Sequence, residues 1–214
     1  MPTPDHQADP LHVQALLRRW LAARIDAAGL HWLDHAREEL LDGAVDRVFF
    51  AAYGNVARHV GDEDLALSDS ERAEAVEARR GWDPGHWTTS EAARAFLLLS
   101  LDDSDPAAYR DVVTYLLKER TDLGGMIALC RSLPILPHPE RHREWAVAVT
   151  RTERKALFEA VALNNPFPAE WFSEEEWNQM VVRAGFLGCP SNAIQGLERR
   201  ANPALTHMLK GSSA

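Results

Sequence analysis

Two histidines lie at helical spacing near the N-terminus, an arrangement that can hold a metal ion. His31 and His35 are four residues apart, so one helix face would present both imidazoles. Zinc proteases with this spacing carry a glutamate directly after the first histidine, whereas this chain has Trp32 there. The nearby carboxylates, which would also suit a solvated helix face, are Asp34, Glu38 and Glu39. The solvated face is the favoured interpretation, and we assign no metal.

Two further clusters of ionisable side chains lie in the middle of the chain. The first resembles aspartates that hold magnesium against a diphosphate, although its spacing differs from the aspartate-rich motif of prenyl-chain enzymes; it comprises Asp102, Asp103 and Asp105. Asp105 directly precedes Pro106, which is typical of a helix cap. The second lies at a proline-marked helix start, where a carboxylate complements the helix dipole; it comprises His138, Glu140 and His142. The structural interpretation is favoured for both.

Motifs for covalent or cofactor chemistry are missing from the sequence. It contains no Gly-x-Ser-x-Gly and no phosphate loop of the Walker or dinucleotide type. Neither Cys130 nor Cys189 has a basic neighbour in a context that would activate a thiol. We therefore predict no cofactor, and two buried, unpaired thiols in a reducing compartment.

The C-terminal third gathers amide, aromatic and cationic side chains in a short span. Amides beside an apolar helix stripe need buried partners or a ligand, so this density favours a binding site. The alternative is that the tryptophans are core, that an asparagine ends a helix before Pro166, and that the arginines pair with surface carboxylates. Both interpretations stay open for this set, which is Asn164, Asn165, Trp171, Trp177, Asn178, Gln179, Arg199, Arg200 and Asn202.

The segments that would position these side chains have helical periodicity. Between Ala44 and Val60 the apolar residues recur at three- and four-residue steps, which places them on one helix face. The same spacing recurs in residues 16–21, 109–117 and 177–184. Hairpin signals flanked by alternating apolar residues are missing, so we predict an all-α fold without a sheet.

Helix starts are marked in the sequence as well. Ser68, Thr88 and Ser173 are each followed three residues later by glutamate, the pattern of a reciprocal capping box. Asp105 and Asn202 are each followed by proline, which is favoured at the first helical position because its missing N–H is not needed there. Five helix beginnings are therefore predicted from local sequence.

The length of 214 residues and the short connections favour one domain. Proline-rich connections are expected at residues 80–85, 134–139 and 164–168, so that successive helices pack as antiparallel neighbours. The architecture would then be a single-domain multi-helix bundle or a short stack of antiparallel helix pairs. We predict a flexible N-terminus over residues 1–9, a helical domain over 10–209 and a frayed end over 210–214.

Charge and hydropathy narrow the function classes. The formal net charge is −9 and no run of Lys or Arg occurs, which argues against binding nucleic acid or an anionic membrane. No apolar stretch reaches the roughly 18 residues needed to span a bilayer, and the N-terminus lacks the pattern of a secretory signal. We therefore predict a cytoplasmic protein without membrane insertion.

Several segments of the chain resemble the EboA family. The resemblance is most specific in Ala160–Glu170, Trp177–Val181 and Gly196–Ala204. Upstream segments also look like EboA proteins in the same order, namely Asp64–Leu67, Gly81–Pro84, the helix around Ala92–Arg94 and Leu133–Arg141. The resemblance covers most of the chain from about Asp64 onward. Family members carry a further basic and aromatic tail, whereas this sequence ends at Ala214.

The resemblance implies a role in bacterial specialised metabolism, that is, in making, carrying or exporting a natural product. EboA-like proteins are associated with a prenyltransferase-like membrane protein, a TatD-like hydrolase and sugar-phosphate isomerase-like proteins. One hypothesis is that a cavity between helices binds a small hydrophobic or aromatic intermediate, with a cofactor-free cyclisation or isomerisation as its reaction. The other is a non-catalytic scaffold or carrier that binds another pathway protein.

The first hypothesis assigns roles to particular residues. Glu159 and Glu176, with Glu170 as a further candidate, would act as general acid or base if desolvated. Guanidinium and amide groups would bind a carboxylate, phosphate or developing oxyanion. The substrate-binding residues would be Trp177, Asn178, Gln179, Arg199, Arg200, Asn202 and Asn165.

Overall fold

The computed structural model describes residues 8–42, 48–116 and 122–211. Within these ranges the chain forms α-helices and short 3-10 turns and no strand, apart from one isolated bridge between Asp64 and Thr88. The predicted all-α fold is confirmed. The helices are α1 (Pro10–Ala22), α2 (Ala27–Leu41), α3 (Phe50–Val60), α4 (Asp69–Ala78), α5 (Thr89–Leu98), α6 (Pro106–Tyr115), α7 (Leu123–Ser132), α8 (Arg143–Val149), α9 (Lys155–Ala162), α10 (Phe167–Trp171), α11 (Glu174–Phe186) and α12 (Pro203–Gly211).

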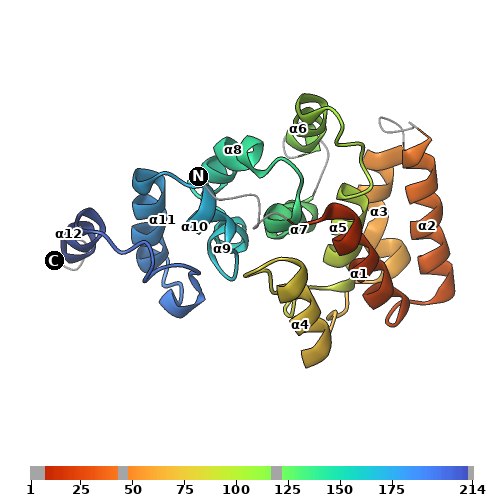
Figure 1. The fold of residues 1–214 in the computed structure, drawn as a ribbon, viewed down its shortest axis with the longest axis horizontal. Coiled ribbons are helices and arrows are strands. Elements are labelled where there is room, and N and C mark those ends of the chain that lie inside the picture. Colours follow the sequence, from red (N-terminus) through yellow and green to blue (C-terminus); the bar gives the residue numbers. More distant parts are fainter. Residues whose placement is uncertain (1–7, 43–47, 117–121, 212–214) are drawn as a thin grey trace.

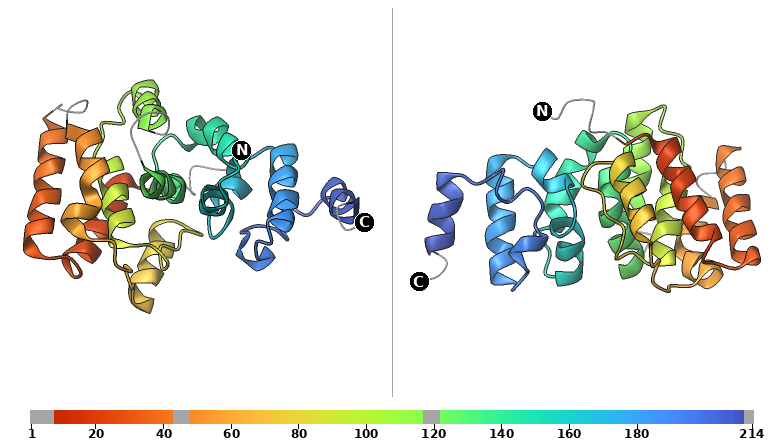
Figure 2. Two further views of the ribbon diagram at one scale, coloured as in Figure 1. Left: turned by 180° about the vertical axis from the view of Figure 1, so that it is seen from behind. Right: turned by 60° about the horizontal axis from the view of Figure 1, so that its bottom comes forward.

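The helices are spread along the long axis of the molecule, with α1 beside α5 and inward of α2. Figure 1 shows α2 at one end and α12 at the other, with α5 and α7 near the middle. The two further views of Figure 2 keep this order, and α12 stands at the end of the stack in each. Short 3-10 turns interrupt the later half, namely η4 (Leu133–Ile135), η5 (Pro139–His142) and η6 (Ser191–Ala193). The arrangement is therefore an elongated stack of helices.

All three predicted capping boxes are present. In each, the Ser or Thr side chain accepts a hydrogen bond from the glutamate N–H, and the glutamate side chain accepts one from the capping residue. These boxes begin α4, α5 and α11, and the cap-and-proline pairs begin α6 and α12. Asp9 adds a cap that the sequence analysis placed in the flexible terminus, because its carboxylate accepts from the N–H groups of Leu11 and His12. Local chemistry thus fixes where these helices start.

The apolar stripes predicted from spacing are buried. The buried stripe of α1 consists of Leu16, Leu17, Trp20 and Leu21, and that of α11 consists of Trp177, Met180, Val181 and Ala184. The stripe expected from Ala44 is confirmed over α3, while residues 43–47 lie outside the described ranges. Gly124 and Gly125 lie in α7.

Two apolar clusters form the core, and α7 contributes to both. Helices α1 to α6 enclose the first cluster, which includes Leu129 of α7. Helices α8 to α12 enclose the second, which includes Cys130 of the same helix. Trp145 packs against both. Helix α5 is buried along its whole length, and α7 packs between α5 and α9. Because α7 and Trp145 are shared, the two clusters are joined through a common helix.

None of the helices in the described ranges combines the length and apolar character needed to cross a membrane.

Candidate functional site

The amide groups predicted to bind substrate on α11 and α12 bind each other. Asn178 Nδ2 donates to Asn202 Oδ1 at 3.2 Å, and Asn202 Nδ2 donates to Asn178 Oδ1 at 2.9 Å. Asn202 Oδ1 also accepts from the backbone N–H of Leu205 at 2.8 Å, which caps α12. Asn178 is only 3% exposed. The pair therefore joins α12 to α11 and satisfies two amides that would otherwise be buried without partners.

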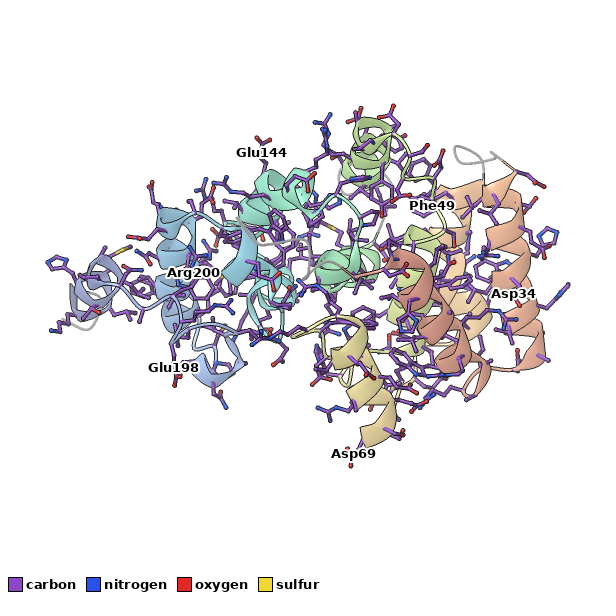
Figure 3. All side chains as sticks on the ribbon, in the orientation of Figure 1. Asp34, Phe49, Asp69, Glu144, Glu198 and Arg200 are labelled. Atoms are coloured by element: carbon purple, nitrogen blue, oxygen red, sulfur yellow. The ribbon has the colours of Figure 1, made fainter. Side chains whose placement is uncertain are left out.

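Arg200 binds backbone carbonyl groups of α10 and of the residue that follows it. Its Nη1 donates to the carbonyl oxygens of Pro168 at 3.1 Å and Phe172 at 2.9 Å, and its guanidinium carbon lies 4.9 Å from the ring centroid of Trp177. Burial and the neighbouring Arg199 lower the pKa of Arg200. Figure 3 shows Arg200 beside α10 and α11, whereas Glu198 points outward. Carbonyls at a helix C-terminus favour such a cation, so this contact stabilises the fold.

Asn165 also has its polar atoms occupied by backbone groups. Its Nδ2 donates to the carbonyl oxygens of Cys130 at 3.1 Å and Ala160 at 3.2 Å. Its Oδ1 accepts from the N–H of Phe167 at 3.0 Å. Asn164, the residue before it, has a positive φ of 51°, a conformation that asparagine tolerates better than most residues. Asn165 thus holds the connection between α9 and α10 against α7.

The three candidate acids or bases are all engaged in ion pairs. Glu170 pairs with the buried Arg79, Glu159 lies 3.7 Å from the Lys155 ammonium, and Glu176 lies 2.8 Å from a terminal nitrogen of Arg143. Burial raises the pKa of Glu176, but hydrogen bonds from Ser173 and Arg143 outweigh it and lower that pKa overall. Glu176 is therefore held as a carboxylate at neutral pH.

The two remaining candidates, Gln179 and Arg199, are exposed. Gln179 accepts a hydrogen bond from Arg151 at 3.2 Å and donates one to Glu175 at 3.0 Å. Arg199 lies against Gly196, whose φ of 81° favours glycine. The sequence-predicted residues thus fall into two sets. Asn178, Asn202 and Arg200 form a connected group around Trp177 and bond to one another or to the backbone, although the buried Trp177 Nε1 has no hydrogen-bond partner among the described residues. Gln179 and Arg199 occupy separate positions on the surface.

A groove between α8, α11 and α12 contains two of the predicted residues, Glu176 and Gln179. Its volume is about 310 Å³, at the lower end of the range for ligand pockets. Phe186 forms part of its wall and is 70% exposed, so the described parts of the chain leave most of this ring uncovered. The other lining residues are Val147, Thr150, Arg151, Met180, Val182, Arg183 and Met208. The groove therefore combines an apolar wall with amide, guanidinium and carboxylate groups.

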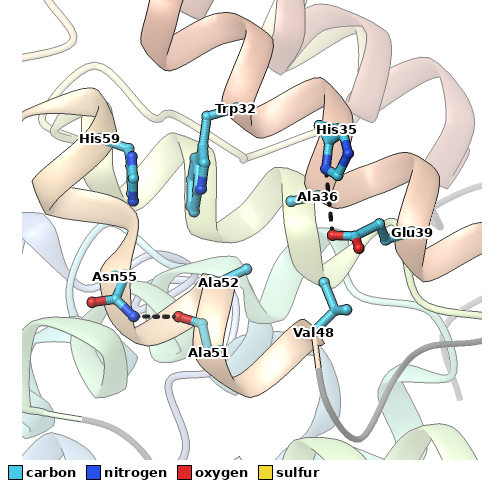
Figure 4. A pocket seen from close by; sticks show the side chains of 9 residues that line it. All are labelled: Trp32, His35, Ala36, Glu39, Val48, Ala51, Ala52, Asn55 and His59. Carbon is cyan, nitrogen blue, oxygen red and sulfur yellow. Dashed lines mark hydrogen bonds and ion pairs between the residues drawn. The ribbon is translucent and has the colours of Figure 1, made fainter.

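The histidine segment near the N-terminus forms a different surface. Figure 4 shows a pocket of about 280 Å³ between α2 and α3. Trp32 and His59 stack there with ring centroids 4.1 Å apart, and His35 lies 3.4 Å from the Glu39 carboxylate. His31 does not line this pocket. The described residues contain no group of three or more histidine, cysteine, aspartate or glutamate side chains placed to share a metal ion.

The second and third ionisable clusters have structural roles. Asp105 caps α6, and Asp102 accepts a hydrogen bond from the Ser104 N–H, which lowers its pKa. His138 Nε2 lies 2.8 Å from the carbonyl oxygen of Asp103. His142 is fully buried, and burial lowers its pKa to about 4 even though a hydrogen bond to the Pro137 carbonyl opposes this. The favoured structural interpretation agrees with these contacts.

The cysteines are both free, and their environments differ. Cys130 is buried, which raises its pKa to about 12. Cys189 is only partly buried, so the expectation of two buried thiols holds for one of them. Burial and the neighbouring Glu159 raise the pKa of Cys189. Neither environment promotes a reactive thiolate.

Sequence reasoning missed several groove residues, of which Phe186 had the clearest signal. It lies off the apolar stripe of α11, beside the exposed Gly185, at a position where a helix normally presents a polar side chain. Arg151 and Met208 carry no such signal, because they reach the groove from α8's C-terminal end and from α12.

A family model described as metabolite traffic protein EboA matches residues 13–213. The chain belongs to the EboA family. The match includes most of α1 and all of α2 and α3, which precede the segments that carry the resemblance in the sequence. It also includes every residue lining the α8–α11–α12 groove. No curated protein and no solved structure gives a significant match to this EboA-family chain.

Proposed function

We propose that this EboA-family protein binds a small hydrophobic or aromatic metabolite in the α8–α11–α12 groove and passes it on within a pathway of specialised metabolism. The observation that carries the proposal is Phe186, an aromatic side chain left 70% exposed at the wall of an apolar groove. Exposing a ring of this size is unfavourable unless something covers it, and a ligand ring stacked on it would regain that energy. The family description, metabolite traffic, agrees with such a role.

The polar side chains of the groove would orient the metabolite. Gln179 and Arg151 already hydrogen-bond each other at its edge, so both are held in place. A hydroxyl, carbonyl or carboxylate on the ligand could bind to the remaining donors of this pair, while the apolar part would contact Met180, Val182 and Phe186. This division between one polar edge and one apolar wall is typical of sites that bind a small molecule.

The ionisation of Glu176 favours binding over acid catalysis at this residue. The pKa values of Glu71, Asp102 and Glu176 are each lowered by hydrogen bonds that their carboxylates accept. A general acid at neutral pH needs the opposite shift. Glu176 is the one of the three in the groove, and its hydrogen bonds from Ser173 and Arg143 make it a weaker base as well. Cofactor-free cyclisation or isomerisation therefore has less support than carriage.

A second candidate function rests on the same exposed wall. Phe186 and Met208 line the groove with exposed side chains, 70% and 37%, so another pathway protein could cover them instead of a small molecule. Protein partners bury exposed aromatic and methionine side chains in the same way. The experiment must therefore distinguish a metabolite from a protein partner.

The test is a search for a retained small molecule. The full chain is purified under mild conditions from cells that contain the metabolic pathway and is then denatured. The released compounds are identified by mass spectrometry. Phe186→Ser is compared with Val76→Ser, a matched control because Val76 is 48% exposed on α4, away from the groove. We expect a hydrophobic or aromatic compound with the parent and with Val76→Ser, and its loss with Phe186→Ser.

Two other outcomes would change the conclusion. Equal retention by both variants would place the ligand elsewhere in the molecule. If the parent protein retains no small molecule, and a defined partner protein binds the parent but not Phe186→Ser, metabolite binding is contradicted and the scaffold function is supported.

A further inference from the structure

A second cavity lies at the opposite half of the molecule from the groove. It has a volume of about 620 Å³ between the start of α1, the end of α2 and the segment after α5. Leucines make most of its apolar surface, and two of them, Leu11 and Leu41, are 72% and 61% exposed. The leucines are Leu11, Leu40, Leu41, Leu99 and Leu101. The cavity is large enough for a ligand with an extended apolar part.

Arg37 is the cation among the described residues that line this cavity. Its Nε donates to Gln14 Oε1 at 3.3 Å, and its terminal nitrogens have no hydrogen-bond acceptor among the residues that the structure describes. No ion pair joins it to a carboxylate in the same ranges of the chain. A guanidinium group beside leucines normally has an anionic partner, because its planar donors match a carboxylate in a two-point contact. The terminal nitrogens of Arg37 are therefore available to a ligand.

A buried network holds Arg37 in place. Gln14 is 5% exposed, and its Nε2 donates to Ser100 Oγ at 2.7 Å and to the Phe96 carbonyl at 3.4 Å. Ser100 Oγ in turn donates to the same carbonyl at 2.8 Å. With its amide nitrogen bound to α5 and the following turn, Gln14 can present only its oxygen to Arg37. A guanidinium fixed in this way loses less entropy when it binds an anion.

Two of the three carboxylates around the cavity already have hydrogen-bond donors. Asp9 accepts from the N–H groups of Leu11 and His12, and Asp102 accepts from the Ser104 N–H. Asp103 lies 3.9 Å from the His138 ring nitrogen, and its side chain is 48% exposed. These three aspartates still repel a ligand with two or more negative charges. A ligand with a single carboxylate at Arg37 is instead stabilised by direct contact with the guanidinium group.

We propose that this cavity binds an amphipathic monocarboxylate, with its carboxylate on the terminal nitrogens of Arg37 and its apolar tail along the leucines. The site is independent of the α8–α11–α12 groove and shares no residue with it. The tail covers Leu11 and Leu41, the two most exposed leucines of the described chain. A neutral ligand leaves the guanidinium unpaired, and a cationic one is repelled by it.

The test uses decanoate as the probe, with the full-length protein in a titration calorimeter. Decanol and decylamine have the same tail with a neutral or cationic head. We expect decanoate to bind and both analogues to bind at least about tenfold more weakly, because a hydrogen bond to a charged group contributes about 1.5–3 kcal/mol. Arg37→Gln should weaken decanoate by about tenfold or more. Arg58→Gln makes the same charge change at an exposed position on α3 and should leave the affinity unchanged.

A second variant guards against a folding defect in Arg37→Gln. Leu41→Glu places a negative charge at the exposed mouth of the cavity and should weaken decanoate severalfold without affecting the fold. Phe186→Ser should leave decanoate binding unchanged, which separates this site from the groove. Equal binding of decanoate and decanol, or undiminished binding by folded Arg37→Gln and Leu41→Glu, would overturn the proposal.

Discussion

Two arginines, one in each half of the molecule, have opposite surroundings. Arg200 donates to the carbonyl oxygens of Pro168 and Phe172 and stacks on Trp177, so its charge stabilises the end of α10. Arg37 is held by one bond to Gln14, and its terminal nitrogens face a leucine-lined cavity. The first comes from the segment richest in unusual polar residues, and the second from an ordinary amphipathic helix.

The comparison shows that dense polar sequence does not by itself indicate a ligand site. In the C-terminal half the amides of Asn165, Asn178 and Asn202 satisfy backbone groups and each other. Such bonds are what a short helix stack needs, because several of its helices are only a few turns long and cannot be stabilised by their own hydrogen bonds alone. A cation such as Arg37, whose terminal nitrogens have no acceptor among the described residues, is the more informative signal.

The largest expected effect tests whether Glu170 stabilises the fold. Glu170→Gln leaves Arg79, which is 4% exposed, as an uncompensated buried cation, so the unfolding free energy should fall by about 3–5 kcal/mol. Urea denaturation measures it. Glu74→Gln is the control, because Glu74 forms an exposed ion pair with Arg19 and should cost no more than about 1 kcal/mol. Equal losses in the two variants would show that the Glu170 pair is no better than a surface pair.

The second largest expected effect concerns His142, a histidine that is buried in the folded protein. Its pKa is about 4 in the folded protein against 6.5 for an ordinary histidine. The unfolded chain therefore binds a proton that the folded protein does not, and stability present above pH 6.5 is lost as the pH falls towards 4. We expect the unfolding free energy to fall by about 3 kcal/mol over this range from this group.

The variants identify the titrating group. Denaturation at several pH values should show a shallower loss for His142→Gln than for the parent, while His207→Gln, at an exposed position on α12, should keep the parent slope. An unchanged slope in His142→Gln would assign the acid sensitivity to other residues.

The smallest effect tests the amide pair between α11 and α12. Asn202→Ala removes the partner of the buried Asn178 and the cap of Leu205, so we expect a loss of about 1–3 kcal/mol. A double-mutant cycle with Asn178→Ala should show that the two losses are not additive, because the residues share their hydrogen bonds. The exposed Asn192→Ala should have almost no effect. Additive losses would mean that the two amides act independently, which would reopen a ligand role for either.

Much of the fold could be predicted from local sequence. The capping boxes at Ser68, Thr88 and Ser173 and the apolar stripes of α1 and α11 appear as expected, because capping and burial depend on residues only three or four positions apart. The Asp9 cap was missed, since its segment is short and polar. The elongated order of the helices depends on contacts between distant segments, such as α5 with α7, which no local pattern contains.

The sites were harder to predict than the helices. Glu176 and Gln179 were found as candidates and do line a groove. Phe186 completes it from a position marked by its place off the apolar stripe of α11, and Arg151 from a position that the sequence does not mark. Arg37 had a weak signal, because it follows Leu33 by four residues and precedes Leu40 by three, which puts a cation on the apolar stripe of α2. An arginine at that position can equally place its guanidinium group in solvent. The spacing alone therefore does not show whether Arg37 lines a cavity.

The sequence by itself determined the all-α class, the starting points of five helices, the buried faces of several and the family, because each depends on residue types at fixed short spacing or on the order of motifs along the chain. Only the tertiary structure decided which polar groups already have partners. Asn178 is satisfied by Asn202 across a chain distance of 24 residues, and Arg37 meets Gln14 across 23. Whether a side chain binds the protein or is left for a ligand depends on such distant contacts, and these form only when the helices pack.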